Sequence, residues 1–323
     1  MTFTYRLHGL TVRSDLELAA TELPDDRLAG ADAAAPSGAE VRPDLTLRQL
    51  PPGAVPAEPA PGRLIAETPG ADGSRFCSAS ATDSGVVLRF HGLCEFRFSP
   101  AVDTVGWTLH PGVSPEMAAV MAAGAMMAVA LMLKGHLVLH ASAVSAGDRA
   151  VAFVGRAGMG KSTLATLACT AGCRFVTDDV LRVDGGECYP GSSEARLRPS
   201  AGSLAESVRG ARLRRTVDGR TGVELLPPGG DRLVLAAVVV PELIRGAEVV
   251  TAHRLPALAA TVVLSRYPRV LGWRDHDTAA QQFQHLADLA STVPVWVAQV
   301  PWPPTLPTLV PDLLSAVGVG DNL

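Results

Sequence analysis

The sequence predicts an α/β fold preceded by a small β-rich region, and three observations support this. From residue 137 onward, short apolar runs typical of buried strands alternate with longer segments of helical periodicity. Within that part a glycine-rich loop, residues 155–162, joins one such strand to one such helix. The first 112 residues instead hold short strand-like runs among many prolines. We therefore expect two domains, residues 1–112 and residues 113–323.

The β-rich region is predicted from alternating apolar and polar residues between turn signals. The expected strands are residues 2–7, 10–12, 44–48, 86–90 and 94–98. Outside the third of these strands, residues 24–62 are expected to be loop, because they contain eight prolines. Strands this short expose their edges unless another segment covers them.

A long apolar helix is expected over residues 115–134. Ser114 is a suitable N-cap, and Pro115 fits the first helical position. Its uncharged stretch, residues 117–133, is shorter than the roughly 20 residues that a membrane span needs. We therefore expect a core helix and no membrane association.

The α/β part is predicted as strands and helices in alternation. The expected strands are residues 137–145, 151–154, 174–177, 233–240 and 295–300. The expected helices are residues 161–171, 255–265, 277–291 and 307–317.

The glycine-rich loop matches the phosphate-binding pattern G-x-x-x-x-G-K-[ST]. Its residues are Gly155, Arg156, Ala157, Gly158, Met159, Gly160, Lys161 and Ser162, followed by Thr163. A strand precedes it, and the helix after it ends where Gly172 can serve as the C-cap. In this geometry backbone N–H groups hold a phosphate chain, Lys161 reaches the β- and γ-phosphates, and the Ser162 hydroxyl holds Mg²⁺.

Lysine usage supports that interpretation. The chain has 28 lysines and arginines together, and only Lys134 and Lys161 are lysines. A compact ammonium fits where a planar guanidinium does not, so the lysine in the loop indicates a chemical requirement.

Three further residues are candidates for the chemistry of this site. Asp178 and Asp179 follow the strand after the loop helix, where one carboxylate can hold Mg²⁺ and the other can accept a proton. The alternative is a turn in which both aspartates cap the next segment. His140 ends the strand before the loop strand, and its alternative is a histidine satisfied at a strand end.

These residues together carry a family resemblance. Residues 139–144, 155–162 and 175–179 resemble the catalytic domain of bacterial HPr serine kinase/phosphorylase, with a histidine, a phosphate loop and an aspartate pair in the same order. The whole chain looks more like the HPr-kinase-like proteins of peptide natural-product clusters. In lasso-peptide pathways such proteins phosphorylate a precursor peptide on serine. The resemblance is specific over residues 137–184 and weaker over residues 185–310.

The resemblance implies a P-loop kinase core and roles for individual residues. Residues 155–163 would cradle ATP, Ser162 and one of the two aspartates would hold Mg²⁺, and the other aspartate would be the base with His140 beside it. We favour Asp178 as the metal ligand and Asp179 as the base. The resemblance does not separate the roles of the two aspartates. The segment 190–199 resembles a second motif of the family, which makes Glu194 a candidate metal ligand and Arg196 a candidate phosphate or substrate contact. The alternative for both is a solvated charged loop.

The chain also departs from the family pattern. Ala157 stands where HPr kinases usually have serine, so one hydroxyl near the phosphates is absent. Residues 1–112 do not look like the N-terminal domain of authentic HPr kinases. HPr as the acceptor, and the reverse phosphorolysis reaction, are therefore left open.

Composition narrows the kinds of partner, metal site and cellular compartment that the chain can have. The net charge is −4 and no basic stretch is interleaved with aromatics, which excludes a nucleic-acid partner. Five cysteines without C-x-x-C spacing indicate reduced thiols and no zinc site. The first residues lack the order of a signal peptide, so we expect a cytoplasmic protein.

The sequence thus predicts an ATP-dependent serine kinase that acts on a peptide or protein hydroxyl, with residues 1–112 recognising the acceptor. One alternative is a nucleotide-binding accessory or scaffold protein without phosphotransfer, and another is a small-molecule kinase. The acceptor, the nucleotide preference and the oligomeric state, including a homo-oligomer, stay open.

Overall fold

The computed structural model describes residues 1–23, 42–70, 73–208, 211–303 and 308–319. The chain divides into two compact units. The first unit is Met1–Lys134 with Val270–His276, and the second is Gly135–Arg269 with Asp277–Leu323. The division thus falls after Lys134 and not at 112/113, because the helical segment after residue 114 packs against a strand of the first unit. Part of the predicted loop, residues 24–41, lies outside the described residues.

The first unit is built on one nine-stranded sheet, in the order β3-β1-β2-β4-β9-β8-β7-β6-β5. Its strands are β1 (Phe3–Leu7), β2 (Leu10–Ser14), β3 (Thr21–Glu22), β4 (Leu45–Gln49), β5 (Arg63–Pro69), β6 (Arg75–Thr82), β7 (Gly85–Phe90), β8 (Cys94–Phe98) and β9 (Thr104–Leu109). All five expected strands are present. Strands β3, β5, β6 and β9 were not expected; β3 has only two residues, and β6 is built mainly from small residues such as serine and alanine, which give a weak strand signal.

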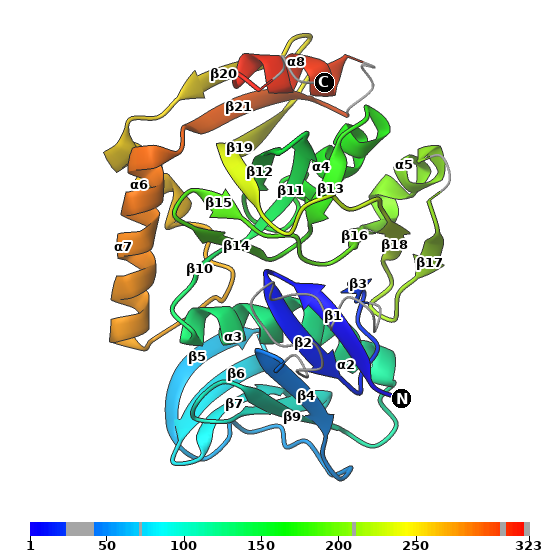
Figure 1. Cartoon of the computed structure of the whole chain (residues 1–323), viewed down its shortest axis with the longest axis vertical. Coiled ribbons are helices and arrows are strands. Elements are labelled where there is room, and N and C mark those ends of the chain that lie inside the picture. Colours follow the sequence, from blue (N-terminus) through cyan, green and yellow to red (C-terminus); the bar gives the residue numbers. More distant parts are fainter. Residues whose placement is uncertain (24–41, 71–72, 209–210, 304–307, 320–323) are drawn as a thin grey trace, which may run out of the picture. The chain divides into compact units, whose positions relative to one another are not determined.

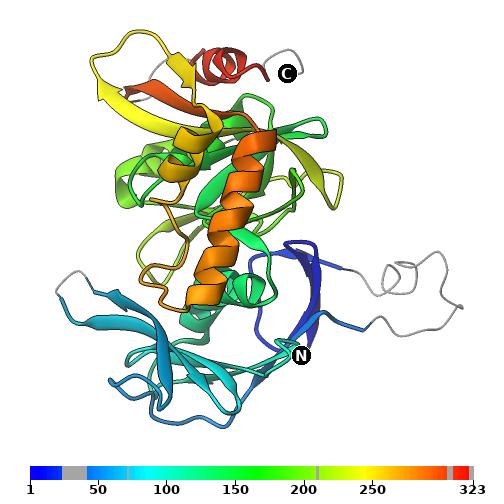
Figure 2. The ribbon, with the colours of Figure 1, turned by 90° about the vertical axis from the view of Figure 1, so that its left-hand side faces the viewer.

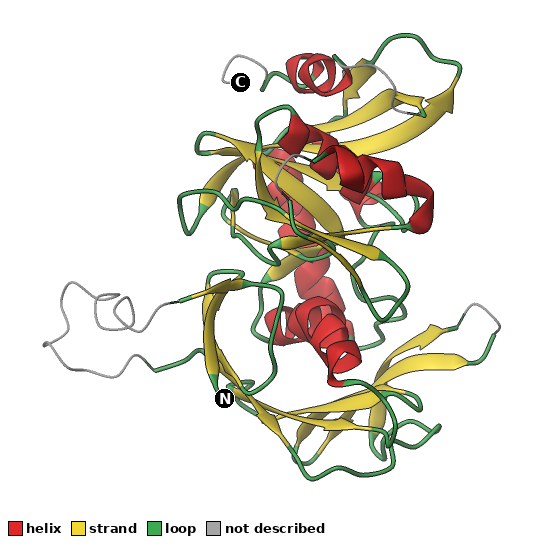
Figure 3. Cartoon of the chain, turned by 90° about the vertical axis from the view of Figure 1, so that its right-hand side faces the viewer, coloured by secondary structure: helices red, strands yellow, loops and turns green. Residues whose placement is uncertain are grey.

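The helical segment of the first unit consists of α2 (Pro115–Met121), the π-helical turn η1 (Ala122–Met126) and α3 (Met127–Leu133). The Ser114 hydroxyl accepts a hydrogen bond from the Glu116 N–H at 3.2 Å, which confirms the expected cap. By length and composition this segment could cross a membrane, but 61% of its most apolar window is buried, as in many core helices. Figure 3 shows the sheet curving around it.

A return segment of the chain covers the β5 edge of this sheet. The Arg274 N–H donates to the carbonyl of Ile65 at 2.6 Å, and the Arg274 guanidinium pairs with Glu67 at 3.1 Å. Gly272 has φ +65°, and a Cβ there would lie 2.2 Å from the Glu67 carbonyl oxygen. Only glycine can therefore approach β5 this closely.

The second unit is built on a mixed sheet in the order β10-β14-β15-β19-β12-β11-β13, with β21 pairing β19 and β20 (Figure 1). Its strands are β10 (Leu137–Leu139), β11 (Ala141–Ala146), β12 (Arg149–Val154), β13 (Arg174–Thr177), β14 (Leu181–Asp184), β15 (Glu187–Cys188), β19 (Leu233–Arg245), β20 (Thr251–Arg254) and β21 (Val295–Trp302). The pairs β12–β19 and β19–β21 are parallel, and the others are antiparallel. A smaller sheet has the order β16-β18-β17, from β16 (Glu194–Leu197), β17 (Leu213–Arg215) and β18 (Thr221–Glu224).

Helices cover both faces of the mixed sheet. They are α4 (Lys161–Thr170), α5 (Gly202–Ser207), α6 (Ala257–Leu264), α7 (His276–Thr292) and α8 (Leu309–Ala316), with a short 3₁₀ turn η2 (Pro199–Ala201) before α5. Along β12, Val151 and Phe153 join the core under α4 and α8, while Ala150 and Ala152 join the core under α6 and α7. In Figure 2, α7 faces the viewer in front of strands of the mixed sheet. Two covered faces confirm a mixed α/β fold.

The largest difference from the expectation lies between residues 181 and 224. Five strands, β14 to β18, occupy a stretch for which the sequence predicts none. Each is two to four residues long, which is too short to show a period, and several carry charged residues.

Candidate functional site

The loop predicted to bind phosphate lies between β12 and α4. Gly158 and Gly160 have φ +93° and +80°, and a Cβ on Gly160 would lie 3.2 Å from the Leu243 side chain. Among the described residues no side chain caps the N-terminus of α4, so its first N–H groups keep their hydrogen-bonding capacity. Gly172 ends the helix as expected, with its N–H donating to Cys169 and that of Cys173 to Ala168, the Schellman pattern.

The outer part of the loop faces solvent. Arg156, Ala157 and Gly158 are exposed, whereas Met159 is half-buried and its sulfur accepts the Arg156 N–H at 3.0 Å. The half-buried Thr163 lies in the first turn of α4. The predicted loop residues therefore form one exposed turn of backbone just before the N-terminus of α4.

Lys161 is buried in this loop without a matching anion. Its ammonium donates to the carbonyl of Arg156 at 3.1 Å and lies 3.4 Å from His140 Nε2. No carboxylate among the described residues lies within ion-pair distance of it. Burial lowers the pKa of Lys161, and the charges of Asp178 and Asp179 only partly oppose that effect. A buried cation with neutral partners favours binding of an anion.

Asp178 lies beside the loop and is nearly buried. One of its oxygens accepts hydrogen bonds from the Ser162 hydroxyl at 2.8 Å and the Ser142 hydroxyl at 2.5 Å. The other oxygen accepts the Arg196 N–H at 3.0 Å. Ser162 and Asp178 thus place two oxygen ligands together at the start of α4.

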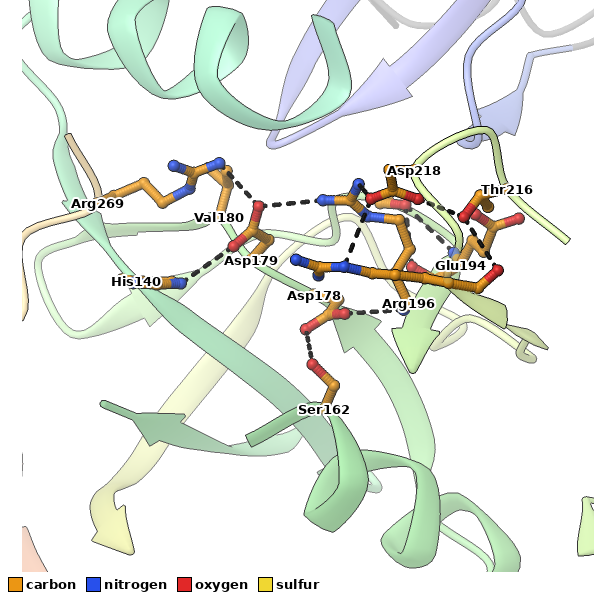
Figure 4. A network of polar contacts seen from close by, with 12 residues as sticks. His140, Ser162, Asp178, Asp179, Val180, Glu194, Arg196, Thr216, Asp218 and Arg269 are labelled. Atoms are coloured by element: carbon orange, nitrogen blue, oxygen red, sulfur yellow. Dashed lines mark hydrogen bonds and ion pairs between the residues drawn. The ribbon is translucent and has the colours of Figure 1, made fainter. Parts of the chain in front are cut away.

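Asp179 faces a different set of groups, as Figure 4 shows. Its oxygens lie 3.1 Å from His140 Nε2, 2.7 Å from an Arg269 nitrogen and 3.3 Å from an Arg196 nitrogen. Burial by itself would raise the pKa of Asp179, but Arg269, the hydrogen bond from His140 and Arg196 together hold it well below the usual value. Asp179 also has φ +75°, a left-handed conformation uncommon for a residue other than glycine. The aspartate pair is therefore more than a turn cap, because each carboxylate has its own partners.

His140 lies between Lys161 and Asp179, and both contacts involve the same ring nitrogen, Nε2. A protonated Nε2 donates to Asp179, whereas a bare Nε2 accepts from Lys161. Burial lowers the pKa of His140, Lys161 and Arg269 lower it further, and Asp179 opposes them. His140 is thus part of the charged cluster, as expected.

Glu194 and Arg196 lie on strand β16 and not on a solvated loop. Glu194 is buried, and Arg214 holds both of its oxygens, one of them at 3.1 Å. A Cβ on Gly222 would lie 2.5 Å from the Glu194 carboxyl group, so this arrangement requires glycine there. Arg196 joins Asp179 to Asp218, the latter at 3.1 Å.

Among the described residues, Glu194 shares no hydrogen bond with Ser162 or Asp178, the other two predicted metal ligands. Among the residues that the structure describes, no group of three or more His, Cys, Asp or Glu could hold a metal ion. Glu194 makes its hydrogen bonds to Arg214, while Ser162 and Asp178 bond each other. Its metal role stays a prediction.

Three residues of the site were not assigned a role from the sequence: Ser142, Arg198 and Arg269. Ser142 lies two residues after His140, a spacing that could have suggested a shared side of the strand. The Arg198 guanidinium lies over the loop, 3.6 Å from where a Cβ on Gly158 would be. Nothing local to Arg269 marks it, because it contacts Asp179 from 90 residues away.

No protein-family model matches the chain, and no curated protein does either. Among solved structures, the chain is similar to the HPr(Ser) kinase/phosphatase from Coxiella burnetii. The match has 13% sequence identity and a TM-score of 0.26, and it covers 56% of this chain and 93% of that chain. This is a distant structural resemblance, so a function must follow from the contacts of the site itself.

Proposed function

We propose that this chain is an ATP-dependent kinase that transfers a phosphoryl group to a serine or threonine hydroxyl of a peptide or protein. The observation that carries the proposal is the buried Lys161 ammonium, which lies in a strand–loop–helix phosphate motif without an anionic partner. A ribosomally made precursor peptide of the lasso type is the proposed acceptor, on the resemblance of the sequence alone.

The loop fits a nucleotide triphosphate. Its two left-handed glycines, Gly158 and Gly160, expose backbone N–H groups, and the uncapped first turn of α4 adds more donors. The Lys161 ammonium would then exchange its bond to the Arg156 carbonyl for the β- and γ-phosphates. Arg198, which lies beside the loop, would neutralise additional phosphate charge.

The pair of Ser162 and Asp178 fits Mg²⁺. Both are oxygen ligands, and their oxygens already lie 2.8 Å apart beside the loop. When bound, Mg²⁺ neutralises charge on the phosphates. Ser142 donates to the same Asp178 oxygen and so fixes the carboxylate for that task.

Asp179 and His140 are the proposed groups at the acceptor hydroxyl. Asp179 stays ionised because Arg269 and Arg196 lower its pKa, so it can accept a hydrogen bond from the hydroxyl and orient it. The hydroxyl proton would pass to Asp179 during transfer, and His140, which burial keeps neutral near pH 7 by lowering its pKa, would take it up at Nε2 in the tautomer that leaves this nitrogen bare.

A second candidate function is a nucleotide-binding scaffold that holds ATP and a peptide without transferring phosphate. The environment of Asp179 favours the scaffold function, because the two arginines beside this carboxylate make it a weaker proton acceptor. A phosphotransferase needs both aspartates, whereas a scaffold needs only the metal ligand. The two candidates therefore differ in the effect of changing Asp179.

The proposal is tested by measuring Mg-ATP binding and phosphate transfer for the wild type and Lys161→Ala. Calorimetry should show binding to the wild type and at least ~10-fold weaker binding to the variant, as expected for loss of a charge-assisted contact. With γ-labelled ATP and serine-containing peptides, label should reach peptide with the wild type only. Equal ATP affinity for both proteins would contradict the assignment of this loop as the nucleotide-binding site. Binding of ATP without phosphate transfer would favour the scaffold function.

A further inference from the structure

One part of this acidic chain is strongly basic. Residues 194–220 contain seven arginines and three acidic residues, whereas the whole chain has a net charge of −4. This part includes β16 and β17 of the three-stranded sheet and the turn that leads into β18. Three of these arginines, Arg196, Arg214 and Arg215, lie on β16 and β17, and Arg220 directly precedes β18.

A pocket of about 390 Å³ lies on that sheet. Three of its lining residues are arginines, Arg214, Arg215 and Arg220, and the others include Leu213 and Thr221. None of the lining residues is acidic or aromatic. The pocket is thus a cationic recess without a surface on which a base could stack.

The three arginines differ in how their charge is compensated. Arg214 is bound to Glu194, and Arg220 lies 3.4 Å from Asp218. Arg215 is exposed and makes no ion pair with the residues that the structure describes. The pocket therefore retains at least one uncompensated cation, with two more that can add hydrogen bonds to an incoming anion.

Contacts connect this pocket to the candidate site. Arg220 pairs with Asp218. Asp218 in turn pairs with Arg196, and Arg196 pairs with Asp179 (Figure 4). Along the chain, Pro199 lines the pocket while its neighbour Arg198 lies over the phosphate loop. A ligand that contacts Pro199 in the pocket would thus lie next to Arg198, the residue whose side chain reaches the phosphate loop.

We propose that this arginine pocket binds an acidic, extended segment of the peptide acceptor and so selects it. The proposal rests on the kinase function proposed above. Arginine forks match carboxylates bidentately, and β17 is the edge strand of its sheet, along which an extended peptide can add backbone hydrogen bonds. A single-stranded nucleic acid is less suited, because such ligands need aromatic side chains for base stacking.

The test is a binding measurement that needs no nucleotide and no transfer. Fluorescence anisotropy is followed for a labelled peptide with a run of glutamates beside one serine, and for the same peptide with glutamines. The wild type should bind the glutamate peptide at least ~10-fold more tightly, as expected for charge-assisted pairing with arginine. Equal binding of the two peptides would overturn the proposal. A single-stranded RNA that displaces the glutamate peptide more strongly than the unlabelled glutamate peptide does would overturn it too.

Two variants locate the site. Arg215→Glu should weaken binding of the glutamate peptide at least ~10-fold through lost attraction and added repulsion, and Arg215→Gln should weaken it by less. The matched control is Arg254→Glu on β20, an exposed arginine with the same charge change in the other sheet. Thermal melts verify folding of each. Equal weakening by Arg254→Glu would indicate non-specific charge attraction and overturn the pocket.

The result separates this proposal from the kinase function. If the protein binds the glutamate peptide but transfers no phosphate, the proposed peptide-binding pocket is supported and the proposed kinase function is contradicted. If transfer occurs, Arg215→Glu should raise KM for the glutamate peptide and leave kcat unchanged, because Arg215 does not touch the proposed reacting groups. A fall in kcat with KM unchanged would contradict a role in acceptor binding.

Discussion

The two units both bury charged side chains, but they compensate these charges differently. In the first unit Arg89 and Glu95 face each other on neighbouring strands, and their side chains are 6% and 5% exposed. The Arg89 guanidinium also donates to the Glu58 carbonyl, and Glu95 also accepts from Arg97. In the second unit the partners of Lys161 among the described residues are neutral, while two arginines and His140 surround Asp179.

The difference indicates which buried charges are structural and which serve a ligand. A structural pair places each charge against its opposite, because an unpaired buried charge destabilises the fold. In the second unit the cations outnumber the anions around the loop, which supports our proposal that a negatively charged ligand binds there. Phosphate is such a ligand.

The largest effect is expected from breaking the structural pair. Glu95→Ala leaves Arg89 buried without its carboxylate and should reduce the free energy of unfolding by about 3–5 kcal/mol. Denaturant unfolding measures it. The matched control is Glu58→Ala, which removes a surface partner of Arg75 with a 75% exposed side chain and should cost less than about 1 kcal/mol. Similar losses in both variants would contradict the distinction between buried and exposed pairs.

The second prediction separates the two aspartates. Asp179→Asn should leave Mg-ATP binding nearly intact and reduce phosphate transfer at least ~10²-fold, as for removal of a positioned base. Asparagine tolerates the left-handed conformation of Asp179, so the backbone is preserved. Asp178→Asn should instead weaken Mg-ATP binding, because it removes a proposed metal ligand. Wild-type turnover in both variants would make the pair structural.

The third prediction concerns the stability of the loop without a ligand. Burial lowers the pKa of Lys161, which means that the folded state disfavours the charged ammonium relative to the unfolded state. Lys161→Met removes that charge and keeps an unbranched side chain, so the Tm without nucleotide should be equal to or above that of the wild type. ATP should raise the Tm of the wild type and leave the variant unchanged. A clearly lower Tm of the variant would show that Lys161 stabilises the fold.

The smallest effect is expected from pH. The folded-state pKa of His140 lies below its usual value of 6.5, so the folded state binds fewer protons there than the unfolded state does. Stability from this group is complete above pH 6.5 and falls as the pH drops toward the folded pKa. Asp179 adds a loss only below pH 3.8.

A comparison of the wild type with His140→Gln isolates that contribution. Between pH 7.5 and 5 the Tm of the wild type should fall more than that of the variant, because only the wild type contains His140. The pKa of His91 is also lowered by burial, but His91 is present in both proteins and so does not contribute to the difference. Parallel Tm curves would mean that His140 does not couple folding to protons in this range.

The features of the site that are contiguous in the chain could be predicted from the sequence. The strand before the loop, the left-handed glycines, Lys161 and the ending of α4 at Gly172 follow from residues within a short stretch, because each depends on local backbone geometry. The aspartate pair was also found, because it follows a clear apolar strand.

The partner that each charged side chain receives depends instead on the tertiary structure. Asp178 and Asp179 are neighbours in sequence, yet one bonds Ser162 while the other faces Arg269, because the left-handed turn at Asp179 directs the two side chains apart. Glu194 obtains Arg214, and Arg196 obtains Asp218, only when the short strands of the small sheet pair. Hydrogen bonds between residues distant in sequence depend on how segments pack, and no local period encodes them.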